Sequence, residues 1–199
     1  VTKSKNKENS LFLTLSIFMG LVIIISNYLV QFPINYFNLK NILTYGAFTY
    51  PITFLITDLA NRRFGRRLAR RVVYIGFILG ILLTLFISTN FDDLISIRIA
   101  IGSGTAFIVA QLLDVEIFQI LRSRKWFVAP ITSSFFGSII DTFLFFSISF
   151  YGTDIPWFSL AIGDLLVKFF IAFLMLVPYR LLIFKIKDIS DIRKNRSFI

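Results

Sequence analysis

The segment LFLTLSIFMGLVIIISNYLV, residues 11–30, contains no charged side chain. An α-helix rises about 1.5 Å per residue, so about 20 apolar residues cross a bilayer core about 30 Å thick. Residues 72–91 form a second uncharged run of the same length. Both segments predict transmembrane helices. We expect the first to be a mature helix, because its apolar run exceeds the ~7–15 residues of a signal peptide.

Four further segments fit a transmembrane helix if a few polar residues are tolerated within them: 41–57, 99–121, 126–150 and 156–179. Pro51 lies inside the first of these and predicts a kink, because proline cannot donate the helical backbone hydrogen bond. Together the segments predict an all-α integral membrane protein with six transmembrane helices.

The six predicted helices occupy most of the chain and leave no room for a second domain. We expect a cytoplasmic N-terminus at 1–10, a single transmembrane domain at 11–184 and a basic cytoplasmic tail at 185–199. The composition agrees, because 56% of the residues are hydrophobic and only 16% are charged, whereas soluble domains carry about 25% charged residues.

The chain contains no cysteine and no histidine. This excludes disulfides, thiolate and imidazole metal ligands, and cysteine or histidine nucleophiles. The acids also form no closely spaced motif on one helix face that would suggest an enzyme. We therefore expect no enzymatic activity, no metal and no cofactor.

Most of the positive charge lies in four short segments, and the exceptions are Lys40, Arg98 and Lys168. The residues in these segments are Lys3, Lys5 and Lys7; Arg62, Arg63, Arg66, Arg67, Arg70 and Arg71; Arg122, Arg124 and Lys125; and Arg180, Lys185, Lys187, Arg193, Lys194 and Arg196. The four segments fall on one side of six crossings, so the positive-inside rule places them and both termini in the cytoplasm. We expect them to face the lipid bilayer and not nucleic acid, since no soluble module presents them.

Polar residues within the predicted helices are the candidate binding groups, because a charge at the bilayer centre costs about 2.5–3.5 kcal/mol and usually faces a bundle interior or a cavity. Asp141 lies near the middle of its helix without a basic residue within one turn. Asp164 and Lys168 are four residues apart, so they either neutralise each other as a helical ion pair or contribute to a binding site.

Gln111 and Asp114 share one face of the fourth predicted helix, because residues three apart are neighbours on a helix. This pair can bind the edge of a planar polar ligand; the alternative is an interhelical hydrogen bond or an ion pair at the helix end. Glu116 points elsewhere on the same helix, and we assign it no role.

Asp58 and Asn61 end the second predicted helix at its cytoplasmic side. They either fix the helix end by pairing with the nearby arginines or contact a substrate. Tyr50 precedes the proline, and a broken helix at this point is a common way to line a cavity. Trp126 falls at the start of the fifth helix, as an interfacial anchor does.

Several blocks of the sequence, taken together and in order, resemble one family. They are TYPITFLITDLANRRFG (49–65), ARRVVYIGF (69–77), AQLLDVEIFQILR (110–122), WFVAPITSSFFGSIIDTFLFF (126–146), LAIGDLLVKF (160–169) and VPYR (177–180). They are similar to the VUT, or queuosine-precursor transporter, family of bacterial inner-membrane proteins, over roughly residues 44–180.

The resemblance implies a six-helix carrier that imports a 7-deazaguanine base bearing a nitrile or an aminomethyl group. The positions that match the family's blocks are Asp58, Asn61, Arg62, Gln111, Asp114, Trp126, Asp141, Thr142, Asp164 and Lys168. A guanine-like ring presents an N–H and an exocyclic amine on one edge, and one carboxylate can accept both. An aminomethyl cation would favour a second carboxylate.

Two other functions stay open. One is a substrate-capture subunit for another vitamin-like molecule, which would need a separate energising partner because the chain has no Walker motif. The other is a structural membrane subunit. The small-residue runs GSGTA (102–106) and SSFFGS (133–138) allow close helix packing within the chain or between chains, so a homodimer also stays open.

Overall fold

A computed structural model describes residues 2–30, 32–34, 43–87 and 93–185 of the chain. These residues are helical apart from their connections and an isolated β-bridge between Pro33 and Thr44, which confirms the predicted all-α class. The helices are α1 (Thr2–Leu29), α2 (Gly46–Thr49), α3 (Ile52–Phe64), α4 (Arg66–Ile87), α5 (Leu94–Leu121), α6 (Val128–Phe150) and α7 (Trp157–Lys185).

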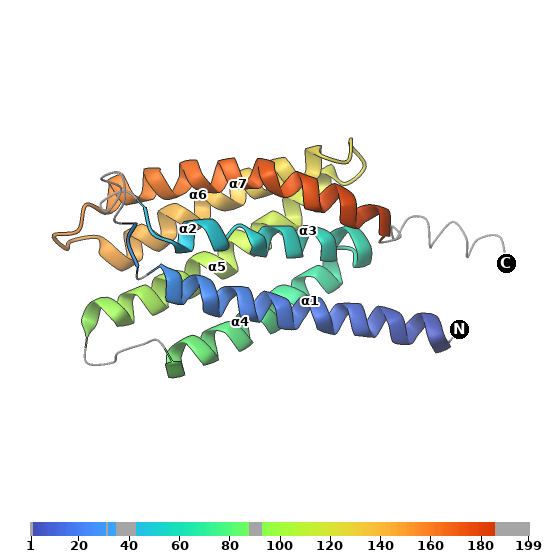
Figure 1. Cartoon of the computed structure of the whole chain (residues 1–199), viewed down its shortest axis with the longest axis horizontal. Helices are drawn as coiled ribbons and strands as arrows, with labels where there is room; N and C mark the ends of the chain where they lie inside the picture. The colour runs from blue at the N-terminus through green and yellow to red at the C-terminus, as the bar shows by residue number, and fades with distance from the viewer. Residues whose placement is uncertain (1, 31, 35–42, 88–92, 186–199) are drawn as a thin grey trace.

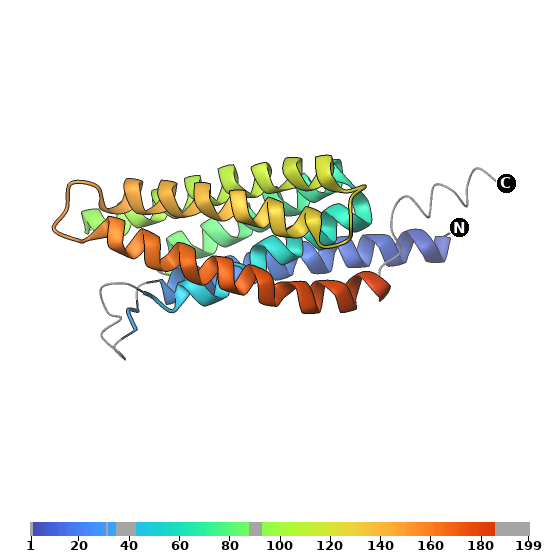
Figure 2. The same cartoon turned by 90° about the horizontal axis from the view of Figure 1, so that it is seen from above.

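The helices lie along one another in an elongated bundle (Figures 1 and 2). The chain runs back and forth between its two ends, with α2 and α3 together forming one pass. One end of the bundle holds the start of α1, the α3–α4 junction, the α5–α6 turn and the end of α7 (Figure 1). We call this the basic end, because the members of the four clusters of positive charge that lie within the described residues belong to these parts of the chain. The opposite end holds the α6–α7 turn and the start of α2.

Four helical stretches within the described residues are long and apolar enough to cross a membrane: Glu8–Leu29, Leu94–Leu121, Val128–Phe150 and Trp157–Phe184. The remaining two predicted spans correspond to α2–α3, which is interrupted, and to α4, which begins with arginines. The chain therefore has the helices of a multi-pass membrane protein, and the count of six spans stays a prediction.

Residues 2–10 are helical and continue into α1, and their place as a cytoplasmic N-terminus stays a prediction. The prediction of a loop for the second basic segment was wrong. The arginines at 62–71, expected in a loop, lie in the last turn of α3 and the first turns of α4, with only Gly65 between the helices. Gly65 has a φ of 80°, which glycine adopts without strain, and its N–H bonds to the Asn61 carbonyl at 2.8 Å. Of the predicted tail, only Lys185 lies within the described residues.

The predicted kink at Pro51 is confirmed as a break between α2 and α3. The carbonyl of Tyr50 accepts the Thr53 backbone N–H at 3.0 Å and the Thr53 hydroxyl at 2.7 Å. These i to i+3 bonds replace the regular helical pattern directly at the proline, which itself has no backbone N–H to donate. The break places the Tyr50 side chain inside the bundle.

Small residues bring the helices of one chain into close contact. A Cβ added at Gly102 on α5 would lie 2.4 Å from the Ser149 hydroxyl oxygen of α6. At Gly137 on α6, it would lie 2.6 Å from the Phe54 ring of α3. Glycine is therefore required for these approaches, and both small-residue runs serve packing within the chain. The homodimer stays a prediction.

Candidate functional site

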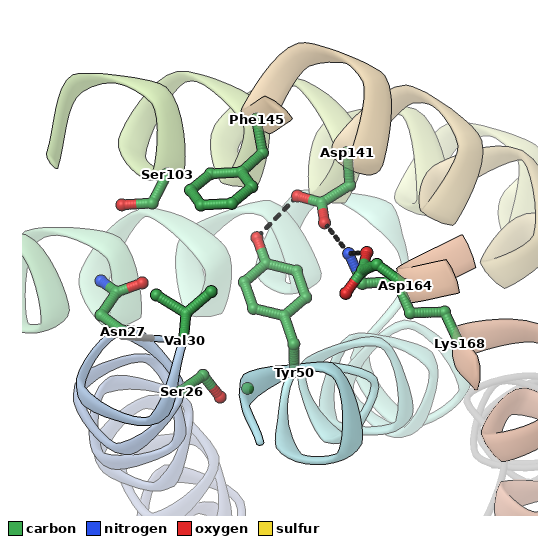
Figure 3. Close-up of a pocket in the computed structure, with 10 residues that line it drawn as sticks. Ser26, Asn27, Val30, Tyr50, Ser103, Asp141, Phe145, Asp164 and Lys168 are labelled. Carbon is green, nitrogen blue, oxygen red and sulfur yellow. Dashed lines mark hydrogen bonds and ion pairs between the residues drawn. The ribbon is translucent and has the colours of Figure 1, made fainter. Parts of the chain in front are cut away.

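Tyr50 connects the helix break to the centre of α6. Its hydroxyl donates a hydrogen bond to Asp141 Oδ1 at 2.8 Å (Figure 3). Asp141 is only 2% exposed, so this bond satisfies a carboxylate that water does not reach. The helix break predicted at Pro51 thus presents an aromatic ring and a hydroxyl group to the intramembrane acid.

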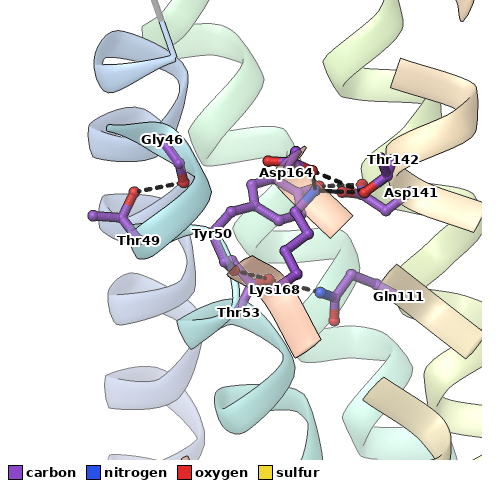
Figure 4. Close-up of polar contacts among 9 residues, drawn as sticks. All are labelled: Gly46, Thr49, Tyr50, Thr53, Gln111, Asp141, Thr142, Asp164 and Lys168. Atoms are coloured by element: carbon purple, nitrogen blue, oxygen red, sulfur yellow. Dashed lines mark hydrogen bonds and ion pairs between the residues drawn. The ribbon is translucent and has the colours of Figure 1, made fainter. Parts of the chain in front are cut away.

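Lys168 lies between two carboxylates. Its Nζ is 2.7 Å from Asp141 Oδ2 and 2.5 Å from Asp164 Oδ2, and it also donates to the Thr142 hydroxyl at 3.0 Å (Figure 4). The Thr142 hydroxyl in turn donates to Asp164 Oδ2 at 2.8 Å. The ammonium group lies 4.9 Å from the centre of the Tyr50 ring, within the range of a cation–π contact. We call Tyr50, Asp141, Thr142, Asp164 and Lys168 the lysine cluster.

The lysine cluster resolves two predictions. The helical ion pair of Asp164 and Lys168 is confirmed. Asp141, which the sequence suggested to be isolated, instead shares Lys168 with Asp164, because packing of α6 on α7 joins residues that are far apart in the sequence. One ammonium group faces two carboxyl groups, so the cluster has one negative charge in excess when both are ionised.

A cavity opens beside the lysine cluster (Figure 3). It contains about 360 Å³ of empty space, including the space at its mouth. Tyr50, Asp141, Asp164 and Lys168 form one part of its lining. The rest includes Phe145 and three small polar residues that our sequence analysis missed, namely Ser26, Asn27 and Ser103. No signal in the sequence marks these three, since serine and asparagine occur in many apolar helices without binding a ligand.

A second acidic pair lies apart from the lining of this cavity. Asp58 on α3 and Asp114 on α5 are 3% and 0% exposed, and their carboxyl groups are within electrostatic range of each other. Ser133 on α6 has one hydroxyl proton, within reach of Asp58 Oδ1 at 3.2 Å and the Pro130 carbonyl at 3.4 Å. Neither oxygen of Asp114 has a partner at full hydrogen-bonding geometry among the described residues, although the Ser133 hydroxyl also acts on its carboxyl group.

Gln111 joins α5 to α3 between the lysine cluster and the acidic pair. Its Nε2 donates to the Thr53 hydroxyl at 2.8 Å, and its Oε1 accepts from the Thr57 hydroxyl at 2.5 Å (Figure 4 shows the first of these bonds). The amide is fully buried and does not line the cavity. One turn further, Asn61 Nδ2 donates to the Val115 carbonyl at 2.9 Å, which adds a second link between the same helices.

Arg62 and Arg122, near Asp58, make their hydrogen bonds to other groups than the Asp58 carboxylate. Arg62 donates to the Tyr179 hydroxyl at 3.2 Å and to the Arg122 carbonyl at 3.1 Å. Arg122 donates back to the carbonyls of Asn61 and Arg62, at 3.1 and 2.5 Å. This reciprocal clasp ties the end of α3 to the α5–α6 turn at the basic end of the bundle. None of the salt bridges within the described residues involves Asp58, although the charge of Arg62 acts on its carboxyl group.

Two further residues from the sequence lie away from the cavity. Trp126 packs against a hydrophobic cluster near the basic end, and the Arg180 guanidinium lies 4.7 Å from the centre of its ring. Glu116 forms salt bridges with Arg66, at 3.0 Å, and with Arg70. Glu116 therefore ties α5 to α4, on a different face from Asp114.

Comparison with known proteins adds an independent observation. Residues 44–183 match the model of a family described as putative vitamin uptake transporter. A probable queuosine precursor transporter of Haemophilus influenzae is 38% identical over 195 residues, covering 82% of both chains. The queuosine precursor transporter of Escherichia coli is 35% identical over 183 residues, again covering 82% of both chains. No solved structure matches the chain.

Proposed function

The chain belongs to the family of putative vitamin uptake transporters, and we propose that it imports a queuosine precursor, 7-cyano- or 7-aminomethyl-7-deazaguanine, across the bacterial inner membrane. The names of the two relatives support this substrate class. The four long apolar helical stretches support a location in a membrane.

The observation that carries the proposal is the position of the lysine cluster on the wall of a cavity. The lining combines a few charged groups with aromatic and small polar side chains, a mixture that suits a small polar ligand. The carboxyl groups of Asp141 and Asp164 are acceptors, and the edge of a guanine-like ring presents donors. The rings of Tyr50 and Phe145 line the same space and supply aromatic surface for a planar base.

The charge of the lysine cluster also fits an aminomethyl base. Lys168 compensates one of the two carboxylates, and an ammonium group on the substrate would compensate the other. We therefore propose that the substrate's donors compete with Lys168 and Tyr50 for Asp141. Opposite charges in a buried site attract more strongly than in water, so the interaction favours a cation over a neutral analogue.

The location of the cavity supports import. Its lining residues lie in the half of the bundle that contains the end of α1 and the start of α2, away from the basic end (Figure 1). The positive-inside rule assigns the basic end to the cytoplasm. With this orientation the cavity faces the outside, and the clasp between Arg62 and Arg122 closes the cytoplasmic side.

A binding measurement on the purified protein tests this function. We expect calorimetry to show binding of both deazaguanine bases and much weaker binding of guanine. Asp141→Asn should lose binding, whereas Glu116→Gln should bind as the wild type does because Glu116 lies away from the cavity. A purified, folded chain that binds neither base would contradict the proposal and favour a structural subunit.

A further inference from the structure

We propose that Asp58 and Asp114 share a bound proton, and that this proton crosses the membrane with the substrate. The acidic pair would thus be the site at which a proton gradient drives accumulation. The proposal rests on the transport function above and adds its source of energy.

The position of the two carboxyl groups favours a shared proton. They come from different helices, α3 and α5, they are almost fully buried, and each lies in the electrostatic field of the other. Two adjacent carboxylates in a medium of low polarity repel each other, so such a pair holds one proton between two acids. In chemical terms, a lone pair of one carboxylate oxygen takes up H⁺ to give a carboxylic acid. The protonated acid is neutral, so it no longer repels the remaining carboxylate.

Several buried polar atoms lack a full partner among the described residues. Neither oxygen of Asp114 accepts a hydrogen bond of good geometry there, and the Ser133 hydroxyl, which acts on it, has a single proton that also faces Asp58. Asn61 Oδ1 and the hydroxyl of Ser138 also lack a partner within the described residues. Both residues are buried, with 0% and 1% of their surface exposed. An ionised carboxylate needs donors, and burying it without them is costly. A proton on the acidic pair removes that requirement.

The charged groups on the helices around the pair form no salt bridge with it within the described residues. On α3, Arg62 acts on Asp58 but binds Tyr179 of α7 and the Arg122 carbonyl. Arg122 binds two carbonyls of α3, and Arg98 of α5 binds two carbonyls at the end of α6. The salt bridges join Glu116 to Arg66 and Arg70, Arg63 to Glu8, and Lys168 to Asp141 and Asp164. A proton would therefore compensate a charge that no salt bridge of the described residues compensates.

Asp58 also has a route for exchange. It lines a second cavity of about 310 Å³, including the space at its mouth, together with the hydroxyl-bearing Ser134 and Ser138. This cavity is lined further by Tyr179, the residue that Arg62 holds near the basic end. A proton released from the pair thus has polar groups beside it in the direction of the cytoplasmic side.

Hydrogen bonds, joined by the covalent frame of Tyr50 and by the peptide bond between Thr57 and Asp58, connect the substrate site to the acidic pair. Asp141 accepts from the Tyr50 hydroxyl, and the Tyr50 carbonyl accepts from Thr53. Thr53 accepts from Gln111, and Gln111 accepts from Thr57, the residue next to Asp58. A substrate that displaces Tyr50 from Asp141 would strain this chain and shift α3 against α5, the two helices that carry the acidic pair. Substrate binding and proton binding would then depend on each other, as linkage requires.

The test uses the full chain in liposomes, with 7-cyano-7-deazaguanine as substrate and a pH-sensitive dye inside. This base carries no ammonium group, so a proton that enters with it travels on the protein. With acid outside and the membrane potential clamped, we expect the wild type to accumulate the base, and addition of the base to acidify the lumen. In Asp114→Asn and Asp58→Asn we expect both effects to be lost. Exchange of internal for external base should lose its pH dependence in these variants. Glu116→Gln is the matched control and should acidify the lumen as the wild type does.

Accumulation by the wild type without acidification, or accumulation driven by a Na⁺ gradient instead, would overturn the proton site and leave the transport function intact. Acidification that persists in Asp114→Asn would also overturn it. The wild-type measurement decides the question even if an aspartate variant fails to fold. A wild type that neither accumulates nor exchanges either deazaguanine base would contradict the transport function itself, which is a different result.

Discussion

Lys168 Nζ lies 2.7 Å from Asp141 Oδ2, although the two residues belong to different helices and are far apart in the sequence. The same ammonium group binds Asp164 one helical turn away on its own helix. One buried lysine therefore holds two buried acids at the wall of the main cavity, and the arrangement leaves one carboxylate without a full countercharge. We expect this excess charge to favour ligands that carry donor groups or a positive charge.

Asp141→Asn should affect the two bases unequally. The substitution preserves shape but replaces an acceptor with a donor group, so it opposes a donor on the base and removes the excess charge. We expect affinity for the aminomethyl base to fall by more than tenfold, since a buried mismatch costs about 1–3 kcal/mol. The nitrile base should lose less. Competition binding with both bases measures the difference, and equal losses would argue against a countercharge role.

Lys168→Met should destabilise the protein strongly. It would leave Asp141 and Asp164 buried without their cation, and breaking a buried ion pair from one side costs about 3–5 kcal/mol. We expect a markedly lower Tm in detergent. Lys125→Met is the matched control, because Lys125 is exposed in the α5–α6 turn. Equal decreases of Tm in both variants would show that the buried ion pairs of Lys168 do not stabilise the fold.

Gln111→Met should weaken the contact between α3 and α5. The variant keeps the side-chain length but loses the bonds to Thr53 and Thr57, each worth about 1 kcal/mol. Gln119→Met is the matched control, since Gln119 Oε1 makes no hydrogen bond within the described residues. We expect a lower Tm in the first variant only. If both variants had the Tm of the wild type, the hydrogen bonds of Gln111 would contribute nothing measurable to stability.

Topology can be read directly because the natural chain contains no cysteine. Arg124→Cys places a thiol in the exposed α5–α6 turn, and Asp154→Cys places one in the exposed α6–α7 turn at the other end of the bundle. An impermeant maleimide added to intact cells should label position 154 and not 124 until the membrane is opened. Labelling of both positions from outside would refute the proposed orientation.

The sequence predicted the all-α class and the long apolar helices because these depend on local composition. It predicted the break at Pro51 because proline interrupts a helix wherever it occurs in the interior. It also identified Asp141, Asp164 and Lys168 as candidates and paired the last two correctly by helical spacing. It missed the bond between Lys168 and Asp141, because contacts between helices depend on which faces meet in the bundle. Ser26, Asn27 and Ser103 were missed for the same reason.

The division of the acids into two sites could not be predicted either. Spacing on α5 suggested either that Gln111 and Asp114 would bind a ligand together or that they would make an interhelical hydrogen bond or an ion pair, and the structure shows an interhelical bond for Gln111. In the bundle, Gln111 is held by two threonines of α3, and Asp114 faces Asp58. Neither lines the main cavity. Helical periodicity assigns a face to a residue but does not say which neighbour covers that face.

The most direct test of the central claim is uptake of labelled 7-aminomethyl-7-deazaguanine into liposomes that contain only the purified chain, compared between the wild type and Asp141→Asn. We predict rapid uptake by the wild type that excess unlabelled 7-cyano-7-deazaguanine blocks and excess guanine does not, and at least a tenfold slower rate in the variant. Equal uptake by the wild type and the variant, or by liposomes with and without protein, would contradict a substrate path through the cavity at Asp141.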